Sequence, residues 1–121
     1  MDVQHKTWAD VTARFDTLPN DSAIRDSGLA FVSFMEKTGW TGVFHPWLSM
    51  FDVYITQTPV HPFQDVPRLK ISPLSDGGAE FRYIDTYQTS RQWVRLAERN
   101  AWHEVFNKLV TQLNWLTVVK G

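Results

Sequence analysis

The sequence contains no cysteine among its 121 residues. A chain without cysteine forms no disulfide framework, binds no metal through thiolates and has no cysteine nucleophile. Long hydrophobic runs are also missing: the longest uncharged stretch, Thr38 to Phe51, is broken by polar residues and a proline and is shorter than the roughly 20 apolar residues that span a bilayer. Met1 is followed by Asp2, Gln4, His5 and Lys6 with no apolar segment of the kind a secretory signal has. We therefore expect a cytoplasmic protein that does not act in a membrane.

Glycine is sparse and scattered, and the only adjacent pair is Gly77-Gly78. The sequence has no G-x-x-x-x-G-K-[ST] or G-x-G-x-x-G motif to bind phosphates, and no G-x-S-x-G turn to present a nucleophilic serine. These absences disfavour a nucleotide-dependent enzyme and a serine hydrolase. We expect a non-enzymatic protein that needs no cofactor.

Metal-ligand spacing is weak as well. No two of the four histidines are four residues apart, the spacing that would place both on one face of a helix. His45 and His61 each precede a proline. Two such loops could meet and bind a metal together with Asp52 or Asp65. The competing interpretation, which we favour, is that His-Pro pairs are turn or packing features. We therefore expect no metal site.

Two carboxylates are predicted on a strand or at its end, Asp52 and Asp85. Facing one cleft, they could serve as general acid and general base if their environments separated their pKa values. Solvated aspartates at strand ends are the more common case. An enzyme built on His and Asp is accordingly the last of our hypotheses.

Helical periodicity marks the first third of the chain. From Lys6 to Leu18, apolar residues recur every three or four positions, which predicts an amphipathic helix that ends before Pro19. A second helix is predicted from an N-cap at Asp21 or Ser22 to about Lys37, where Thr38-Gly39 provides a stop.

Later segments favour strands. Alternation predicts a strand from Phe51 to Ile55, and a hairpin that joins Arg68–Ile71 to Ala79–Asp85 through a turn at Asp76-Gly77. The segment from Ser90 to Ala97 fits either a fourth strand or the start of a helix.

The final element is predicted to be a helix from Asn100 to Trp115, and we favour a strand before it because Asn100 is a good N-cap. The fold class is thus α+β: a single domain over residues 1–121, with a small antiparallel sheet of three to four strands and with N-terminal helices and a C-terminal helix packed on one face. We expect four side chains of the last helix to be buried against the sheet: Trp102, Phe106, Leu109 and Leu113.

Charge is balanced overall, with 12 basic and 13 acidic residues, but it is unevenly distributed. Residues 1–60 carry seven acidic and four basic side chains, whereas residues 61–121 carry six acidic and eight basic ones. Arg91 and Arg95 lie on one face in either structural interpretation of their segment, and in a strand Trp93 lies between them. With Arg82 nearby across the hairpin, these residues form a candidate binding surface, since Arg and Trp are enriched at binding hot spots. Alternatively, the arginines pair with nearby acids while Trp93 packs inward.

Two further tryptophans, Trp40 and Trp47, flank a stretch with no helical period. Aromatic residues in an irregular segment either cover the core or form a recognition loop. Both interpretations stay open, so Trp40 and Trp47 are also candidate binding residues.

In architecture and composition, the chain is similar to immunity proteins that neutralise bacterial toxins, although the resemblance assigns no residue a role. It implies a protein-binding module that blocks a partner, such as a toxin or effector domain, by occlusion. The alternative partner is a nucleic acid bound by a basic and aromatic face. The residues of that face would be Arg68, Lys70, Arg82, Arg91 and Arg95, with Trp93 or Tyr83 for stacking. The sequence does not indicate an oligomeric state.

Overall fold

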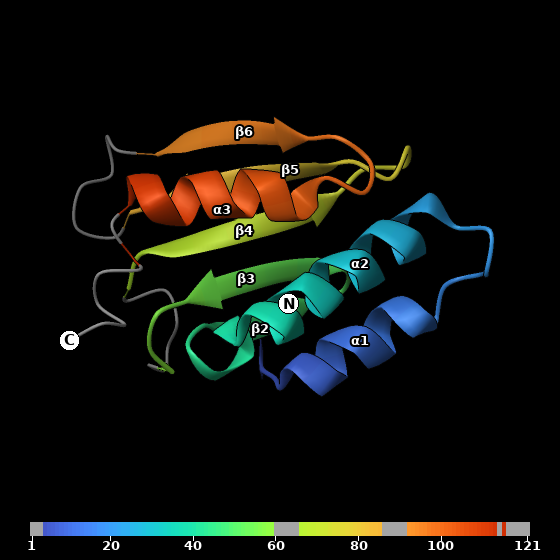
Figure 1. Cartoon of the computed structure of the whole chain (residues 1–121), viewed down its shortest axis with the longest axis horizontal. Helices are drawn as coiled ribbons and strands as arrows, with labels where there is room; N and C mark the ends of the chain where they lie inside the picture. Colours follow the sequence, from blue (N-terminus) through green and yellow to red (C-terminus); the bar gives the residue numbers. More distant parts are fainter. Residues whose placement is uncertain (1–3, 60–65, 86–91, 114, 116–121) are drawn as a thin grey trace.

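The computed structural model describes residues 4–59, 66–85, 92–113 and 115, which form an α+β fold. Figure 1 shows helices on one face of an antiparallel sheet, with α3 (Trp102–Gln112) over one half of the sheet and α1 (Trp8–Asp16) and α2 (Ala23–Thr38) over the other. The predicted fold class and the placement of the helices on one face are therefore confirmed. None of the described helices is long and apolar enough to cross a membrane.

Helix α1 comprises Trp8–Asp16 and begins at a capping box. The Thr7 hydroxyl accepts a hydrogen bond from the backbone N–H of Asp10 (3.1 Å), and the Asp10 carboxylate accepts one from the backbone N–H of Thr7 (3.0 Å). This reciprocal pair satisfies two backbone donors that the first turn leaves without partners. The buried face, Trp8, Val11 and Phe15, follows the spacing seen in the sequence.

Helix α2, Ala23–Thr38, has the predicted ends. The Ser22 hydroxyl accepts from the backbone N–H of Arg25 (3.2 Å). Gly39 ends the helix in the left-handed conformation with φ of 78°, which glycine adopts without steric cost.

Six strands of the described residues form one sheet in which each strand pairs antiparallel with the next, in the order β1-β2-β3-β4-β5-β6. Their bounds are β1 Gln4–His5, β2 His45–Ser49, β3 Asp52–Thr56, β4 Arg68–Pro73, β5 Ala79–Ile84 and β6 Trp93–Ala97. The predicted strand, the hairpin and the favoured strand before the last helix correspond to β3, β4–β5 and β6.

The expectation of three to four strands was too low, because β1 and β2 were missed. Strand β1 has only two residues, too few to show a period. In β2, Pro46, Trp47 and Leu48 are buried in succession, so the strand lacks apolar-polar alternation. Pro46 also suggested a loop, because proline has no backbone N–H to donate within a sheet. The strand tolerates it because Pro46 is not part of the two β1–β2 pairs, Gln4↔Leu48 and His5↔Trp47.

Helix α3, Trp102–Gln112, starts later than predicted, since Asn100 is not its N-cap. Asn100 adopts a left-handed conformation with φ of 61° in the turn between β6 and α3, and its backbone N–H donates to the Ser27 hydroxyl (2.9 Å). Asparagine tolerates this conformation better than most residues, which explains its position. Ala101 occupies the N-cap without a side-chain hydrogen bond.

The core lies between the sheet and the helices. Alternate residues of the central strands face the helices and are buried, among them Ile55, Ile71 and Phe81. Of the four core residues predicted in the last helix, Trp102, Phe106 and Leu109 are buried, and Leu113 is half-buried against the same cluster.

Candidate functional site

Strand β6 forms one edge of the sheet (Figure 1). It pairs with β5 on one side, and within the described part of the chain no strand pairs with its other side. Leu96, on this strand, leaves 69% of its surface exposed, the highest value among the exposed large hydrophobic residues described. An open strand edge presents backbone N–H and C=O groups that another chain can bind.

Two of the predicted binding residues, Trp93 and Arg95, lie together on β6. The register pairs Trp93 with Tyr83 and Arg95 with Phe81, which places both on the face of the sheet that carries the helices. The Arg95 guanidinium lies 4.8 Å from the centre of the Trp93 ring, a cation–π contact. The exposed Arg95 is thus held by the aromatic ring beside it.

Contacts beneath Trp93 hold this arrangement in place. The centres of the Trp93 and Tyr83 rings are 5.3 Å apart, and the hydroxyl of the buried Tyr83 donates to the carboxylate of Asp85 (3.0 Å). A hydrogen-bonded carboxylate and two packed rings therefore support the position of Arg95. Because the side chain is already held in place, it loses less conformational entropy when a partner binds.

A groove of about 260 Å³ runs between β6 and α3. We call it the β6–α3 groove; its lining residues are Arg95, Leu96, Val105, Lys108, Leu109 and Gln112. Neither Arg95 nor Lys108 forms an ion pair with a described residue. The groove therefore combines apolar side chains with two positive charges that no described acid compensates.

Arg82 does not belong to this surface. It pairs with Val94 in the register, so its side chain lies on the opposite face of the sheet from Trp93 and Arg95. There its guanidinium forms an ion pair with Glu80 at 3.1 Å. Arg91, the remaining member of the predicted row, lies outside the described residues.

The sheet face opposite the helices carries a row that crosses all six strands. The register successively pairs His5, Trp47, Tyr54, Lys70, Arg82 and Val94. Both cations of this row have acidic partners, since Lys70 lies 3.7 Å from the Asp52 carboxylate and Arg82 contacts Glu80. The face is therefore close to neutral where the row crosses its centre.

The structure places Trp40 and Trp47 in separate packing environments. Trp40 begins the short 3-10 helix η1, Trp40–Gly42, and is half-buried, with its ring centre 5.6 Å from that of Phe106. Trp47 is 1% exposed and donates through Nε1 to the Thr56 hydroxyl (3.0 Å). Of the two interpretations, these contacts favour packing over a recognition loop.

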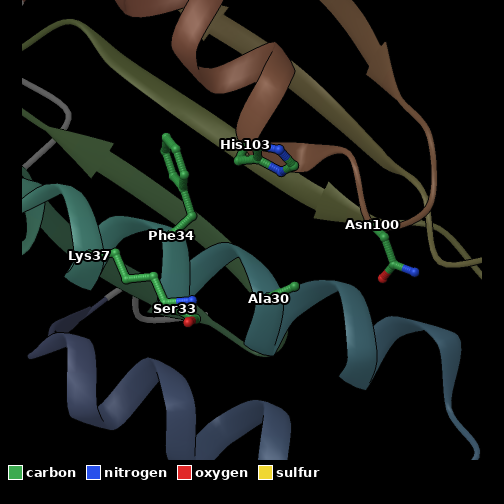
Figure 2. Close-up of a pocket in the computed structure, with 6 residues that line it drawn as sticks. All are labelled: Ala30, Ser33, Phe34, Lys37, Asn100 and His103. Atoms are coloured by element: carbon green, nitrogen blue, oxygen red, sulfur yellow. The ribbon is translucent and has the colours of Figure 1, made fainter.

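A second groove, of about 290 Å³, separates α2 from the start of α3 (Figure 2). Phe34 and His103 face one another across it, with ring centres 5.2 Å apart, and Ser33 and Lys37 project from α2. Asn100 lines its far end. One exposed lysine and one histidine on a shallow apolar surface define no particular ligand chemistry.

His45 lies beside His5, with ring centres 5.8 Å apart. Burial lowers the pKa of His45 below its usual 6.5, and the nearby His5 lowers it further. His61 and Asp65, the other proposed metal ligands, lie outside the described residues. Among the described residues, no group of three or more His, Asp or Glu side chains is positioned to hold a metal ion.

The two strand-associated carboxylates are far apart. Strands β3 and β5 run in the same direction, since both are antiparallel to β4; Asp52 begins β3, whereas Asp85 follows the end of β5. They therefore lie toward opposite ends of the sheet. Asp85 is buried with the Tyr83 hydroxyl, and Asp52 pairs with Lys70, so they form no common acid-base pair.

Leu96 and Lys108 are candidate residues that the sequence analysis missed. Leu96 pairs with Glu80, so its side chain lies on the sheet face opposite the helices, at the edge of the groove. The position of Lys108 depends on the packing of α3 beside the sheet edge, which no local pattern encodes. A signal for Lys108 was present, because it follows Val105 by three positions on a helix and so flanks its apolar stripe.

Comparisons with protein-family models, with curated proteins and with solved structures found no match to this chain. The class of protein is therefore defined by its fold alone: an antiparallel meander, of six strands in the part that the structure describes, with helices on one face.

Proposed function

We propose that this protein is a non-enzymatic protein-binding module that neutralises a partner by occlusion, as immunity and inhibitor proteins do. The observation that carries the proposal is the β6 edge, where an exposed Arg95 lies on Trp93 beside an apolar groove with a second cation, Lys108, that no described acid pairs with. Arg and Trp together are typical of the centre of protein interfaces. This combination favours a partner that covers the apolar side chains of the groove and brings acidic groups to the cations Arg95 and Lys108.

The nucleic-acid alternative has less support. Its residues do not form one patch, because Arg82 and Lys70 lie on the face opposite Arg95 and each has a carboxylate partner. Tyr83, one of the proposed stacking residues, is 4% exposed, which leaves no ring face for a base.

The test is capture of the binding partner from the native host, followed by titration of the purified pair at increasing salt. We expect a protein whose own activity is blocked on binding, and an affinity that falls only modestly between low and moderate salt, because a desolvated interface is weakly screened. A bound nucleic acid whose affinity falls by orders of magnitude over that range would contradict the proposal.

A further inference from the structure

We propose that the β6–α3 groove binds an extended acidic segment of the partner, which adds to β6 as a seventh strand of the sheet. This inference rests on the proposed function and specifies the mode of binding and the chemistry of the partner segment.

The backbone of β6 supplies the first reason. Strand β6 has five residues, near the usual length of a strand, and is paired along one edge only among the described residues. An added strand gains main-chain hydrogen bonds along such an edge, while alternate side chains fill adjacent pockets. On the side that carries the helices, the β6–α3 groove lies directly beside this edge and offers Val105 and Leu109 as apolar contacts.

The charges supply the second reason. The six residues that line the groove include two cations and no acid, and neither cation has an ion-pair partner among the described residues. The Arg95 Nη1 instead donates to the neighbouring carbonyl of Val94 (3.0 Å). A carboxylate of an added strand would replace this local contact with a charge-assisted and potentially bidentate one.

The same charges disfavour a second copy of this chain as the occupant. Arg95 is the central residue of β6, so antiparallel pairing of two β6 strands in full overlap would place the two Arg95 side chains side by side. Like charges directly opposite each other destabilise a strand pair. The edge is therefore protected against self-association and suited to an acidic partner.

The experiment uses the full chain and a synthetic peptide of about eight residues that alternates valine and glutamate, the length of a typical strand. Amide hydrogen exchange and NMR titration follow its binding. We expect alternate amides within Trp93–Ala97 to gain protection and the resonances of Val105 and Leu109 to shift. Arg95→Glu and Lys108→Glu should each weaken binding by about tenfold or more, whereas Lys37→Glu, an exposed lysine in the other groove, should leave it unchanged.

Two control peptides separate strand addition from simple charge attraction. A valine-glutamate peptide N-methylated at every residue keeps its charge but loses all of its main-chain donors, and should not bind. A valine-lysine peptide tests the sign of the charge and should not bind either. Equal binding of either control, or absence of protection in β6 when the unmodified peptide is saturating, overturns the inference.

Failure of this inference is distinguishable from failure of the proposed function. If the valine-glutamate peptide does not bind but Arg95→Ala weakens binding of the captured protein partner, the surface is an interface and strand addition is wrong. If Arg95→Ala also leaves that partner's affinity unchanged, this surface is not the interface.

Discussion

Gly28 shows how a single residue sets the distance between two helices. A β-carbon at this position of α2 would lie 2.6 Å from atoms of the Phe15 ring on α1. Phe15 is fully buried, and its ring also packs against Trp102 at 5.9 Å between centres. The ring therefore has little room to move, and the glycine that weakens the helix pattern in the sequence is what allows α1 and α2 to approach closely.

Gly28→Ala should consequently destabilise the fold. Overpacking of a closed core costs about 1–3 kcal/mol, which exceeds the roughly 1 kcal/mol that alanine gains in helix propensity. Chemical denaturation measures the difference in the free energy of unfolding. The matched control is Gly42→Ala, where an added β-carbon has no atom within 4 Å and should have almost no effect. Equal stability of Gly28→Ala and the parent would show that Phe15 is free to move.

His45 predicts a pH dependence of stability. Its pKa in the folded protein lies below 6.5, chiefly because burial disfavours the charged form. The unfolded chain then binds the proton more tightly than the folded protein does. The contribution of His45 to the free energy of unfolding is therefore fully present above pH 6.5 and is lost as the pH falls from there through the pKa of the folded protein. His45→Gln should flatten the fall of melting temperature below pH 6.5 relative to the parent. An unchanged profile would mean that His45 titrates alike in both states.

At the scale of elements, the sequence predicted best those segments whose pattern is local. The ends of α2 follow from Ser22 and Gly39. Strand β5 alternates because only one of its faces is buried, and β3 alternates in the same way as far as Ile55. Strand β2 was missed because its burial depends on what packs against each face, and this information lies elsewhere in the chain.

In the candidate site, too, some features follow from the local sequence and others depend on how distant segments pair. That Trp93 and Arg95 share a face follows from strand periodicity alone. The separation of Arg82 from them depends on the register between β5 and β6, which pairs Arg82 with Val94 and which no spacing within one strand reveals.

Helix α3 should stabilise the sheet mainly through its buried face. Leu109→Ala removes a side chain that is 2% exposed and should lower the free energy of unfolding by about 2–5 kcal/mol, the range for truncation of a core leucine. Denaturant titration measures the loss. Lys108→Ala, one position earlier and exposed, is the control and should change stability by no more than about 0.5 kcal/mol. A loss at Leu109 no larger than that at Lys108 would contradict the packing of α3 on the sheet.

At the scale of the whole molecule, stability is expected to come from the core without a bound group. Among the described residues, 21 buried hydrophobic side chains form one cluster between the helices and the sheet. We predict that the melting temperature is the same with and without a strong chelator, measured by thermal denaturation. A large drop on chelation would indicate a metal that stabilises the fold, with His45 as the first ligand to examine.

The central claim is that the β6 edge binds a partner protein through Arg95. The most direct measurement is the dissociation constant of the captured partner for Arg95→Ala beside the parent, with melting temperatures recorded for both. Because Arg95 is exposed, the melting temperature should hardly change, while the affinity should fall by about 5- to 150-fold, equivalent to the roughly 1–3 kcal/mol of a contributing interface residue. Unchanged affinity in a fully folded Arg95→Ala variant would contradict the account.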